Sequence, residues 1–367
     1  METNLIRLGD CVLCNPTVKL TKGQLYSLID IDKIEIGRKF VTKKSLVSYS
    51  GQSGCKFEDG DTLMARITPC LENGKMAVAK IEDKGIGSTE LFVFRNREGV
   101  TDKEFVYYLF KQQYIRNLAA NSMTGASGRQ RADLKFVKRI KLNLPLLPIQ
   151  HRIASILSTY DMLIENNTKR IRLLEKMAEN LYKEWFVRFR FPGHEKVEME
   201  NGLPKGWKYV NFGKLSPIVT GKKDANFASP NGKYKFFTCS KADLMADSYS
   251  FDCFAIILAG NGDLNVKLYK GQFEAYQRTY VLTPYDISHI YISYYTIQSE
   301  LDRLLVGAAG AVIKFLTKGM IEKIKIVVPD QSLLRKFNIM LDANFKIRQN
   351  LIAQNTLLAR QRDLLLP

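Results

Sequence analysis

The sequence predicts a mixed α/β (α+β) fold made of two similar strand-rich domains, each followed by a long helix. Three observations predict this architecture: a seven-residue apolar repeat in the middle of the chain, an internal repeat of the whole domain–helix unit, and short apolar runs separated by turn residues. The two helices are expected to pair as an antiparallel coiled coil, which gives the chain an internal pseudo-two-fold repeat.

Residues 1–144 form the first predicted domain. Within it, residues 103–118 are expected to be helical, and the glycine-containing stretch 124–128 interrupts the pattern. Residues 133–144 alternate basic and apolar side chains and predict an edge strand that stops at Pro145. Other strands are expected where short apolar runs lie between turn residues, at 25–31, 62–67, 76–81 and 91–94, with Asn73-Gly74 as a hairpin turn.

Residues 145–190 carry the central helix, whose regular part spans 149–186. This part contains neither Pro nor Gly and is rich in good helix formers. At about 1.5 Å per residue it is roughly 50 Å long. Its apolar seam recurs at steps of four and three, and Asn167 is the polar member that would fix the register of a coiled coil. The seam consists of Ile153, Leu157, Tyr160, Ile164, Asn167, Ile171, Leu174, Ala178, Leu181 and Trp185.

The second half of the chain repeats this order. Residues 191–207 hold many charges and turn residues and predict a linker. Residues 208–328 are again strand-rich and predict the second domain, and residues 329–367 predict a second helix that closes the chain.

The repeat is visible residue by residue. Placing Pro145 on Pro329 brings Ile140 onto Ile324 and overlays the two helices without a gap. Residues 91–94 likewise match residues 279–282. The second helix has a rougher seam, because it holds Asn344, Arg348 and Asn355 among its apolar residues.

Composition narrows the function. The chain has 367 residues, a formal net charge of +18 at pH 7 and a pI of about 9.5, which favours a polyanionic partner, nucleic acid before membrane surface. A repeated basic unit suits duplex DNA with two half-sites, so the architecture predicts a reader of two short sequences separated by an unread gap. The N-terminus lacks a signal pattern and no apolar run is long enough to cross a bilayer, which predicts a cytoplasmic protein.

The sequence contains no pattern typical of catalysis. Cys11 and Cys14 lack a second pair at zinc-ligand spacing, so no metal site is expected. Residues 15–17 do not complete the Asn/Asp-Pro-Pro-aromatic motif of adenine methyltransferases, and no Gly-x-x-x-x-Gly-Lys loop is present for ATP. The histidines are isolated in the sequence, at His151, His194 and His289.

Residues 61–75 (DTLMARITPCLENGK) and 87–92 (GSTELF) resemble the first target-recognition domain of the specificity (S) subunits of type I restriction–modification enzymes. Residues 144–150 (LPLLPIQ), the long helix and Trp185-Phe186 resemble the central conserved region of that family. The second target-recognition domain of the family is resembled at 203–207, 232–240 and 275–282. The resemblance covers nearly the whole chain.

The resemblance implies a subunit that reads double-stranded DNA and is not itself an enzyme. It implies two modification subunits, which bind S-adenosylmethionine and methylate adenine, and restriction subunits, which use ATP and magnesium, so that no cofactor is expected in this chain. Tyr182, Trp185 and Phe186 are expected to be exposed anchors for a modification subunit. Two other classes stay open: an RNA-binding or scaffold protein with a duplicated basic fold, and a catalytic nuclease or methyltransferase.

Polar side chains at strand ends and beside the glycine break are the candidate DNA contacts. Arg and Asn can read base edges with two hydrogen bonds, whereas Lys more often pairs with phosphate. In the first domain the candidates are Arg66, Thr68, Asn73, Lys75, Arg129 and Arg131. In the second domain they are Asn261, Asn265, Lys267, Arg278 and Lys314.

Overall fold

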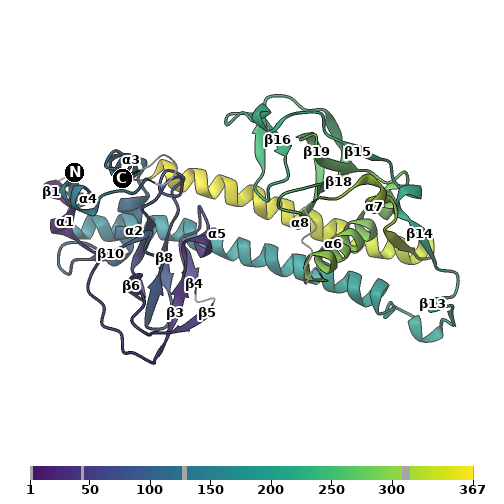
Figure 1. Ribbon diagram of the computed structural model, residues 1–367, viewed down its shortest axis with the longest axis horizontal. Helices are drawn as coiled ribbons and strands as arrows, with labels where there is room; N and C mark the ends of the chain where they lie inside the picture. Colours follow the sequence, from purple (N-terminus) through teal and green to yellow (C-terminus); the bar gives the residue numbers. More distant parts are fainter. Residues whose placement is uncertain (1–2, 43–44, 126–129, 308–314, 367) are drawn as a thin grey trace. The chain divides into compact units, whose positions relative to one another are not determined.

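The computed structural model describes residues 3–42, 45–125, 130–307 and 315–366. The chain forms two compact units: unit 1 comprises Met1–Ile171 and Asn350–Pro367, and unit 2 comprises Arg172–Gln349. Unit 2 is therefore one continuous stretch, whereas unit 1 is assembled from two separate stretches. Figure 1 shows the sheets of unit 1 in purple and blue and those of unit 2 in green. Both units combine sheets with helices, which confirms the predicted mixed fold.

The main sheet of unit 1 is built from β2 (Val12–Cys14), β4 (Phe40–Thr42), β7 (Thr62–Ala65), β8 (Met76–Lys80) and β10 (Leu91–Asn96). Its strand order is β2-β10-β7-β8-β4, and only the β4–β8 pair is parallel. β7, β8 and β10 coincide with three of the apolar runs in the sequence, which confirms those strands. Their side chains are almost continuously buried, as expected for strands covered on both faces.

A smaller sheet and a ribbon complete the strands of unit 1. The smaller sheet contains β3 (Leu25–Ile29), β5 (Ser45–Ser48), β6 (Cys55–Glu58) and β9 (Lys84–Gly87), in the order β5-β3-β9-β6. In the ribbon, β1 (Thr3–Arg7) pairs antiparallel with β11 (Lys141–Pro145). β11 leads directly into the long central helix.

The short helices of unit 1 are α1 (Leu8–Cys11), α2 (Lys103–Lys111), α3 (Gln113–Ala120) and α4 (Leu134–Arg139), with a 3₁₀ turn η1 (Ile31–Lys33). α2 and α3 together confirm the helix predicted at 103–118. The edge strand predicted for 133–144 is wrong in its first half, which is α4. Asp133 is the reason: its carboxylate accepts a hydrogen bond from Lys135 N at 2.9 Å and caps the new helix.

Unit 2 has the same kinds of element. Its main sheet contains β15 (Ile218–Thr220), β16 (Tyr234–Phe237), β17 (Leu244–Ala246), β18 (Phe251–Ala259), β19 (Val266–Ala275) and β20 (Thr279–Leu282), in the order β15-β20-β18-β19-β16-β17. β14 (Lys208–Asn211) pairs antiparallel with β21 (Lys325–Val328), and β12 (Met199–Glu200) with β13 (Leu203–Pro204). The helices and 3₁₀ turns are η3 (His194–Lys196), η4 (Phe212–Lys214), η5 (Ala225–Phe227), η6 (Ile287–His289), α6 (Ile290–Gly307) and α7 (Lys318–Glu322).

The two units repeat one topology. The order β2-β10-β7-β8-β4 in unit 1 matches β15-β20-β18-β19-β16 in unit 2, and in each case only the last pair is parallel. The ribbon β1–β11 matches β14–β21, α4 matches α7, and a long helix follows each ribbon. This agreement confirms the internal repeat, and it means that positions in one unit can be compared with positions in the other.

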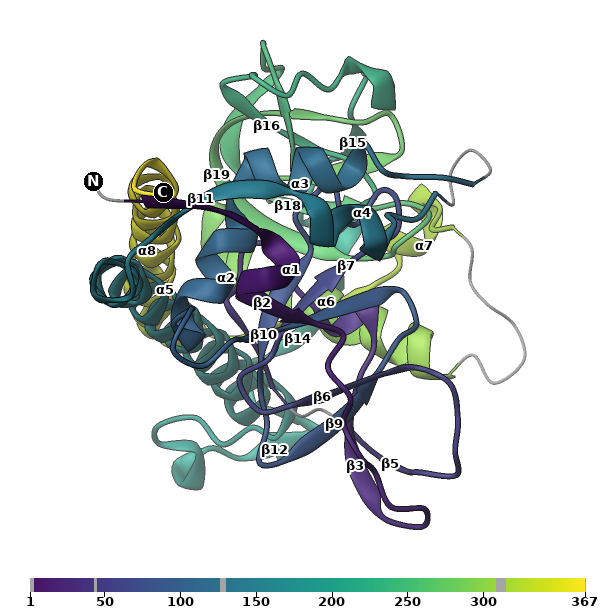
Figure 2. The same ribbon diagram turned by 90° about the vertical axis from the view of Figure 1, so that its left-hand side faces the viewer.

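Two long helices take part in both units: α5 (Leu147–Tyr182), which continues into a π-helical turn η2 (Lys183–Val187), and α8 (Gln331–Leu364). In unit 1 they lie side by side (Figure 2). There Asn167 Nδ2 donates to Gln354 Oε1 at 3.4 Å, and Asp161 forms an ion pair with Arg362. Residue numbers rise along α5 while they fall along α8, so the predicted antiparallel pairing is confirmed in this unit. No helix in the described part of the chain is long and apolar enough to cross a bilayer.

Unit 2 shows the same pairing. Asn344 Nδ2 donates to Leu174 O at 2.9 Å, and Arg348 Nη2 donates to Glu175 Oε1 at 2.6 Å. Asn344 and Arg348 are two of the polar residues that roughen the second seam in the sequence. Their hydrogen bonds to α5 explain how polar groups are tolerated at that seam.

The aromatic residues at the end of α5 are buried. Tyr182, Trp185 and Phe186 belong to the core of unit 2, where Phe186 packs edge-on against Phe337 with ring centroids 4.8 Å apart. The expectation that these three side chains are exposed anchors is therefore wrong, because α8 and the following segment cover them. The predicted linker at 191–207 supplies part of that cover, through Phe191, Leu203 and Trp207.

Candidate nucleic-acid interface

In unit 1, the segment after β7 lies against the segment that precedes α4. Arg66 O accepts a hydrogen bond from Ala132 N at 2.8 Å, and Thr68 N donates to Gln130 O at 3.0 Å. The Arg66 guanidinium lies over the Phe92 ring, 4.9 Å from its centroid, and its Nη2 donates to Ala132 O at 3.1 Å. Arg66 and Thr68 are predicted DNA contacts, and both also form hydrogen bonds at the junction that joins the segment after β7 to the segment before α4.

Arg131 lies beside the same junction on the exposed surface. Its Nε and Nη2 donate to both oxygens of Glu90 at 2.6 to 3.0 Å. These hydrogen bonds lower the pKa of the Glu90 carboxyl, which stays ionised. A bidentate pair of this kind fixes the orientation of the guanidinium plane, so the Arg131 side chain has one defined orientation at the surface.

Asn73 and Lys75 occupy the turn between β7 and β8. This turn is longer than the two-residue hairpin that the sequence predicts, since Asn73 N donates to Pro69 O at 3.0 Å. Lys75 O accepts from Ala65 N at 2.9 Å, which places Lys75 beside the start of the Arg66 junction. Asn73 lies instead on the wall of a cavity that α3 also lines.

In unit 2, the corresponding segment follows β18. Asn265 Nδ2 donates to Cys239 O at 3.3 Å, and Cys239 Sγ donates to Arg278 O at 3.4 Å. Gly260 N also donates to Arg278 O, at 2.9 Å, and Asn261 comes directly after Gly260. The structure thus gathers three predicted contacts, Asn261, Asn265 and Arg278, around Cys239. The Arg278 side chain is exposed.

Lys267 is partly neutralised by its own unit. Its Nζ donates to Asp243 Oδ1 at 2.8 Å and to Ser240 O at 3.0 Å, while Lys235 Nζ bonds the other oxygen of Asp243 at 2.7 Å. Burial by itself would raise the pKa of Asp243, but hydrogen bonds from Lys235 and Lys267 outweigh it and lower the pKa. Lys267 would therefore have to share its charge between Asp243 and a phosphate.

The two junctions occupy the same place in the repeated fold. Arg66 N donates to Glu90 O at 2.9 Å, as Gly260 N does to Arg278 O. The carbonyl oxygens of Arg66 and Gly260 accept in turn from Ala132 N and Leu316 N, which lie just before α4 and α7. Glu90 and Arg278 are therefore equivalent positions with opposite charges. One fold presents two different sets of polar side chains at one edge. The remaining candidates, Arg129 and Lys314, lie outside the described residues.

Known proteins resemble this chain in both sequence and fold. Residues 20–176 match the family described as type I restriction modification DNA specificity domain. The EcoDI specificity subunit of Escherichia coli is 39% identical over 130 residues, which are 35% of this chain and 29% of that protein. The MjaIX specificity subunit of Methanocaldococcus jannaschii is 26% identical over 308 residues, which are 75% of this chain and 70% of that protein.

The chain is similar to the specificity subunits of type I restriction–modification systems. Its fold agrees with that of a solved structure, the S subunit from M. genitalium, with a TM-score of 0.54 at 16% identity, covering 99% of this chain and 95% of that one. At that identity the likeness concerns the fold. The stretch matched by the EcoDI subunit spans less than a third of that protein's length.

Several residues that position the predicted contacts carry no signal in the sequence. Glu90, Cys239 and Asp243 position the predicted contacts, yet none of them lies next in sequence to its partner. Glu90 falls within a stretch noted for its resemblance to the family, but its pairing with Arg131 spans 41 residues. Among the described residues, no group of three or more His, Cys, Asp or Glu side chains is placed to hold a metal ion.

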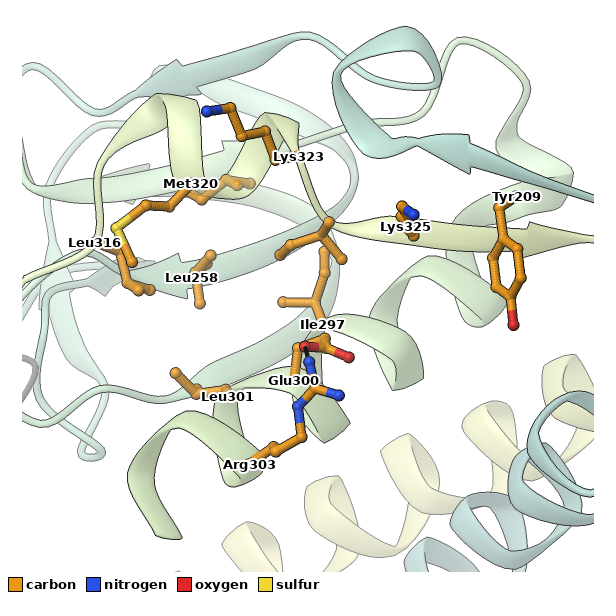
Figure 3. Close-up of a pocket in the computed structure, with 12 residues that line it drawn as sticks. Tyr209, Leu258, Ile297, Glu300, Leu301, Arg303, Leu316, Met320, Lys323 and Lys325 are labelled. Atoms are coloured by element: carbon orange, nitrogen blue, oxygen red, sulfur yellow. Dashed lines mark hydrogen bonds and ion pairs between the residues drawn. The ribbon is translucent and has the colours of Figure 1, made fainter. Parts of the chain in front are cut away.

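A separate cavity of about 610 Å³ lies in unit 2 (Figure 3). Its floor is apolar, with Leu258, Ile297 and Met320, and charged side chains stand at its margin. Glu300 and Arg303 pair with each other at 2.6 Å across that margin. The described residues that line this cavity include none of the predicted DNA contacts.

Proposed function

We propose that the chain reads a bipartite sequence in double-stranded DNA, one half-site for each unit, with an unread spacer between the half-sites. One observation carries the proposal: the same sheet edge occurs twice in one repeated fold and presents different polar side chains each time. Side chains such as Arg131 and Arg278 suit base edges, because a guanidinium can donate two hydrogen bonds to guanine. The net charge of +18 supports a large contribution from phosphate contacts.

The chain is proposed to be non-catalytic and to act in the cytoplasm. In this view, modification subunits bind S-adenosylmethionine and methylate adenine, restriction subunits use ATP and magnesium, and this chain positions both on the target. The proposal rests on the similarity of residues 20–176 to a type I DNA specificity domain and on the sequence, which has no motif for those cofactors. An RNA-binding or scaffold role is less favoured, because two equivalent sites in one fold suit the two-fold symmetry of a duplex.

Salt dependence tests the DNA ligand directly. The logarithm of the association constant for duplex DNA is expected to fall linearly with the logarithm of the salt concentration, by about 0.9 for each phosphate contacted. With six or so contacts the slope would be roughly −5. Fluorescence anisotropy of a labelled duplex between low and physiological salt measures it. A nearly flat slope, or equal affinity for single-stranded RNA, would contradict groove reading of duplex DNA.

Tyr182, Trp185 and Phe186 are buried, so a surface that docks a partner subunit must consist of other residues. Exposed apolar side chains recur at helical spacing on both long helices, which is unusual for solvated surfaces. In unit 1 they are Ile156, Leu163, Leu357 and Leu364, each pair seven residues apart. In unit 2 they are Leu173, Met177, Met340 and Ile347. Because each unit has such a surface, we propose that each contacts one modification subunit.

Polar replacement of one surface checks this assignment. Leu173→Ser combined with Met177→Ser is expected to weaken binding of a modification subunit about tenfold or more, because exposed anchors lose their partner's apolar contact. The melting temperature should not fall, since Leu173 and Met177 are 68% and 58% exposed. Co-purification and thermal melting measure the two effects. Lys176→Ser on the same helix is the control, and equal loss of binding in that variant would count against the apolar surface.

A further inference from the structure

A cavity of about 580 Å³ lies in unit 1, between α3, the turn after β7 and the last turns of α8. Figure 1 shows α3 and the yellow end of α8 close together there. Three cationic side chains line this cavity, Lys111, Arg116 and Arg362, against one carboxylate, Asp363. The lining therefore carries an excess of positive charge.

Lys111 is largely enclosed, with 9% of its surface exposed. Its Nζ lies 3.8 Å from Asp363 Oδ1, which is an ion-pair distance but too long for a hydrogen bond. Burial, with a smaller contribution from Arg362, lowers the pKa of Lys111. The ammonium group also lies over the Tyr107 ring, 5.9 Å from its centroid.

Arg116 adds a second incompletely bonded group. One of its terminal nitrogens donates to Gln113 Oε1, but its Nε is buried without a hydrogen-bond partner among the described residues. The guanidinium lies directly under the turn at Gly74, where an added Cβ would come within 1.9 Å of Arg116 Nη1. The turn therefore holds Arg116 against the cavity.

The carboxylates near the cavity are already engaged. Arg362 forms an ion pair with Asp161 through Nη1 and donates to Asp363 through Nε at 2.9 Å. Asp363 therefore forms a hydrogen bond with Arg362 and only a longer ion pair with Lys111. The carboxylate that lines the cavity does not balance the positive charges of both Lys111 and Arg116.

The repeated fold supplies a comparison. When Tyr107-Tyr108 in α2 is aligned with Tyr294-Tyr295 in α6, Lys111 falls on Gln298. The helix overlay that places Pro145 on Pro329 also places Arg362 on Ala178 and Asp363 on Glu179. A small cavity of about 110 Å³ occurs at that place in unit 2, lined by Glu179, Tyr295 and Gln298. Lys111 and Arg362 are therefore cations of unit 1 alone, whereas the position of Arg116 is taken in unit 2 by Arg303.

We propose that the unit 1 cavity binds a phosphate group between Lys111 and Arg116. A guanidinium offers a planar set of donors that fits phosphate oxygens, and an ammonium group supplies a compact charge beside it. The phosphate would come from inorganic phosphate or a small phosphorylated molecule. A backbone phosphate of DNA is the other source of the same chemistry. The salt dependence of duplex binding distinguishes the two sources.

Thermal melting of the full chain tests the site, with inorganic phosphate and pyrophosphate as probes against chloride at constant ionic strength. A ligand that binds the folded state raises the melting temperature with its concentration until the site saturates, and we expect a rise of a few degrees for the unaltered chain. Lys111→Met and Arg116→Gln should each abolish the rise. Arg303→Gln, at the position in unit 2 that corresponds to Arg116, is the matched control and should keep the full response.

The melting temperature without phosphate gives a second measurement. Lys111→Met should melt no lower than the unaltered chain, because it removes a largely enclosed charge whose carboxylate partner is 3.8 Å away and keeps its hydrogen bond to Arg362. A large fall would mean that Asp363 already satisfies Lys111, and it would overturn the site. A phosphate response that persists in Lys111→Met and Arg116→Gln would overturn it as well.

Measurement of duplex DNA binding distinguishes the source of the phosphate. If neither probe raises the melting temperature, but Arg116→Gln reduces the salt slope of duplex binding by about one phosphate contact, the ligand is a backbone phosphate. In that case the small-molecule source is wrong and the phosphate site stands. If neither the melting temperature nor the slope responds, the proposal is overturned, whereas DNA reading by the two sheet edges is unaffected.

Discussion

Replacing Arg362 with Met is expected to lower the free energy of unfolding of unit 1 by about 3–5 kcal/mol. Arg362 is 1% exposed, and its partner Asp161 is 3% exposed. Asp161 also accepts a hydrogen bond from Tyr108 Oη at 2.6 Å, so the ion pair is part of a buried network. Removing the guanidinium leaves Asp161 as a buried charge without its counter-ion, which is the costly case. Urea denaturation followed by circular dichroism measures the loss.

Two further variants isolate the cause. Arg362→Met combined with Asp161→Leu removes both charges and is expected to recover most of the stability, because apolar replacements of a whole buried pair are often neutral. Arg348→Met removes an ion pair to Glu175, a residue 49% exposed, and should cost about 1 kcal/mol or less. If Arg348→Met lowers the free energy of unfolding as much as Arg362→Met does, burial does not determine how much an ion pair contributes to stability.

Arg278→Ala is expected to relax recognition of one half-site and to leave the other unchanged. A lost bidentate contact to a base costs about 1–3 kcal/mol, or roughly fivefold to 150-fold in affinity for that half-site. The separation follows from the repeat, since Arg278 and its neighbours Asn261 and Asn265 belong to unit 2 alone. Methylome sequencing of cells that carry the complete system identifies which bases of the target become degenerate.

Arg131→Ala is the reciprocal variant, since it alters the equivalent edge of unit 1. It should relax the other half-site and leave the first intact. Arg66→Ala is a poorer choice, because Arg66 also packs on Phe92 and bonds Ala132 O, so its loss would disturb the junction itself. Simultaneous loss of both half-sites in Arg278→Ala, with an unchanged melting temperature, would contradict two separate readers.

The parts of the fold that the sequence predicted are those with a local periodic signal. The central helix follows from its seam, and β7, β8 and β10 follow from short buried apolar runs. The region 133–144 misled the prediction because one capping side chain, Asp133, converts an alternating pattern into the short helix α4. Periodicity alone does not distinguish such a helix from an edge strand.

The candidate site was predictable only in part, because its contacts are long-range. Arg131 and Arg278 were identified as polar residues near strand ends, but the pairing of Arg131 with Glu90 depends on tertiary structure. Trp185 and Phe186 were expected at the surface, and only the packing of α8 over them makes them core residues. Arg362 illustrates the limit, since its partner Asp161 lies 201 residues away.

The division of the chain has a consequence for its biosynthesis. Unit 2 is complete once Arg172–Gln349 has been translated, but unit 1 stays open until the stretch from Asn350 onward has also been made. Throughout that interval the first half of α5 lacks the helix that covers it, and Asp161 lacks Arg362. Domains generally fold as units during translation, so the recognition module encoded first should be the last to reach its native state. A chain whose synthesis stops shortly after Gln349 would therefore have one folded module and one exposed, aggregation-prone module.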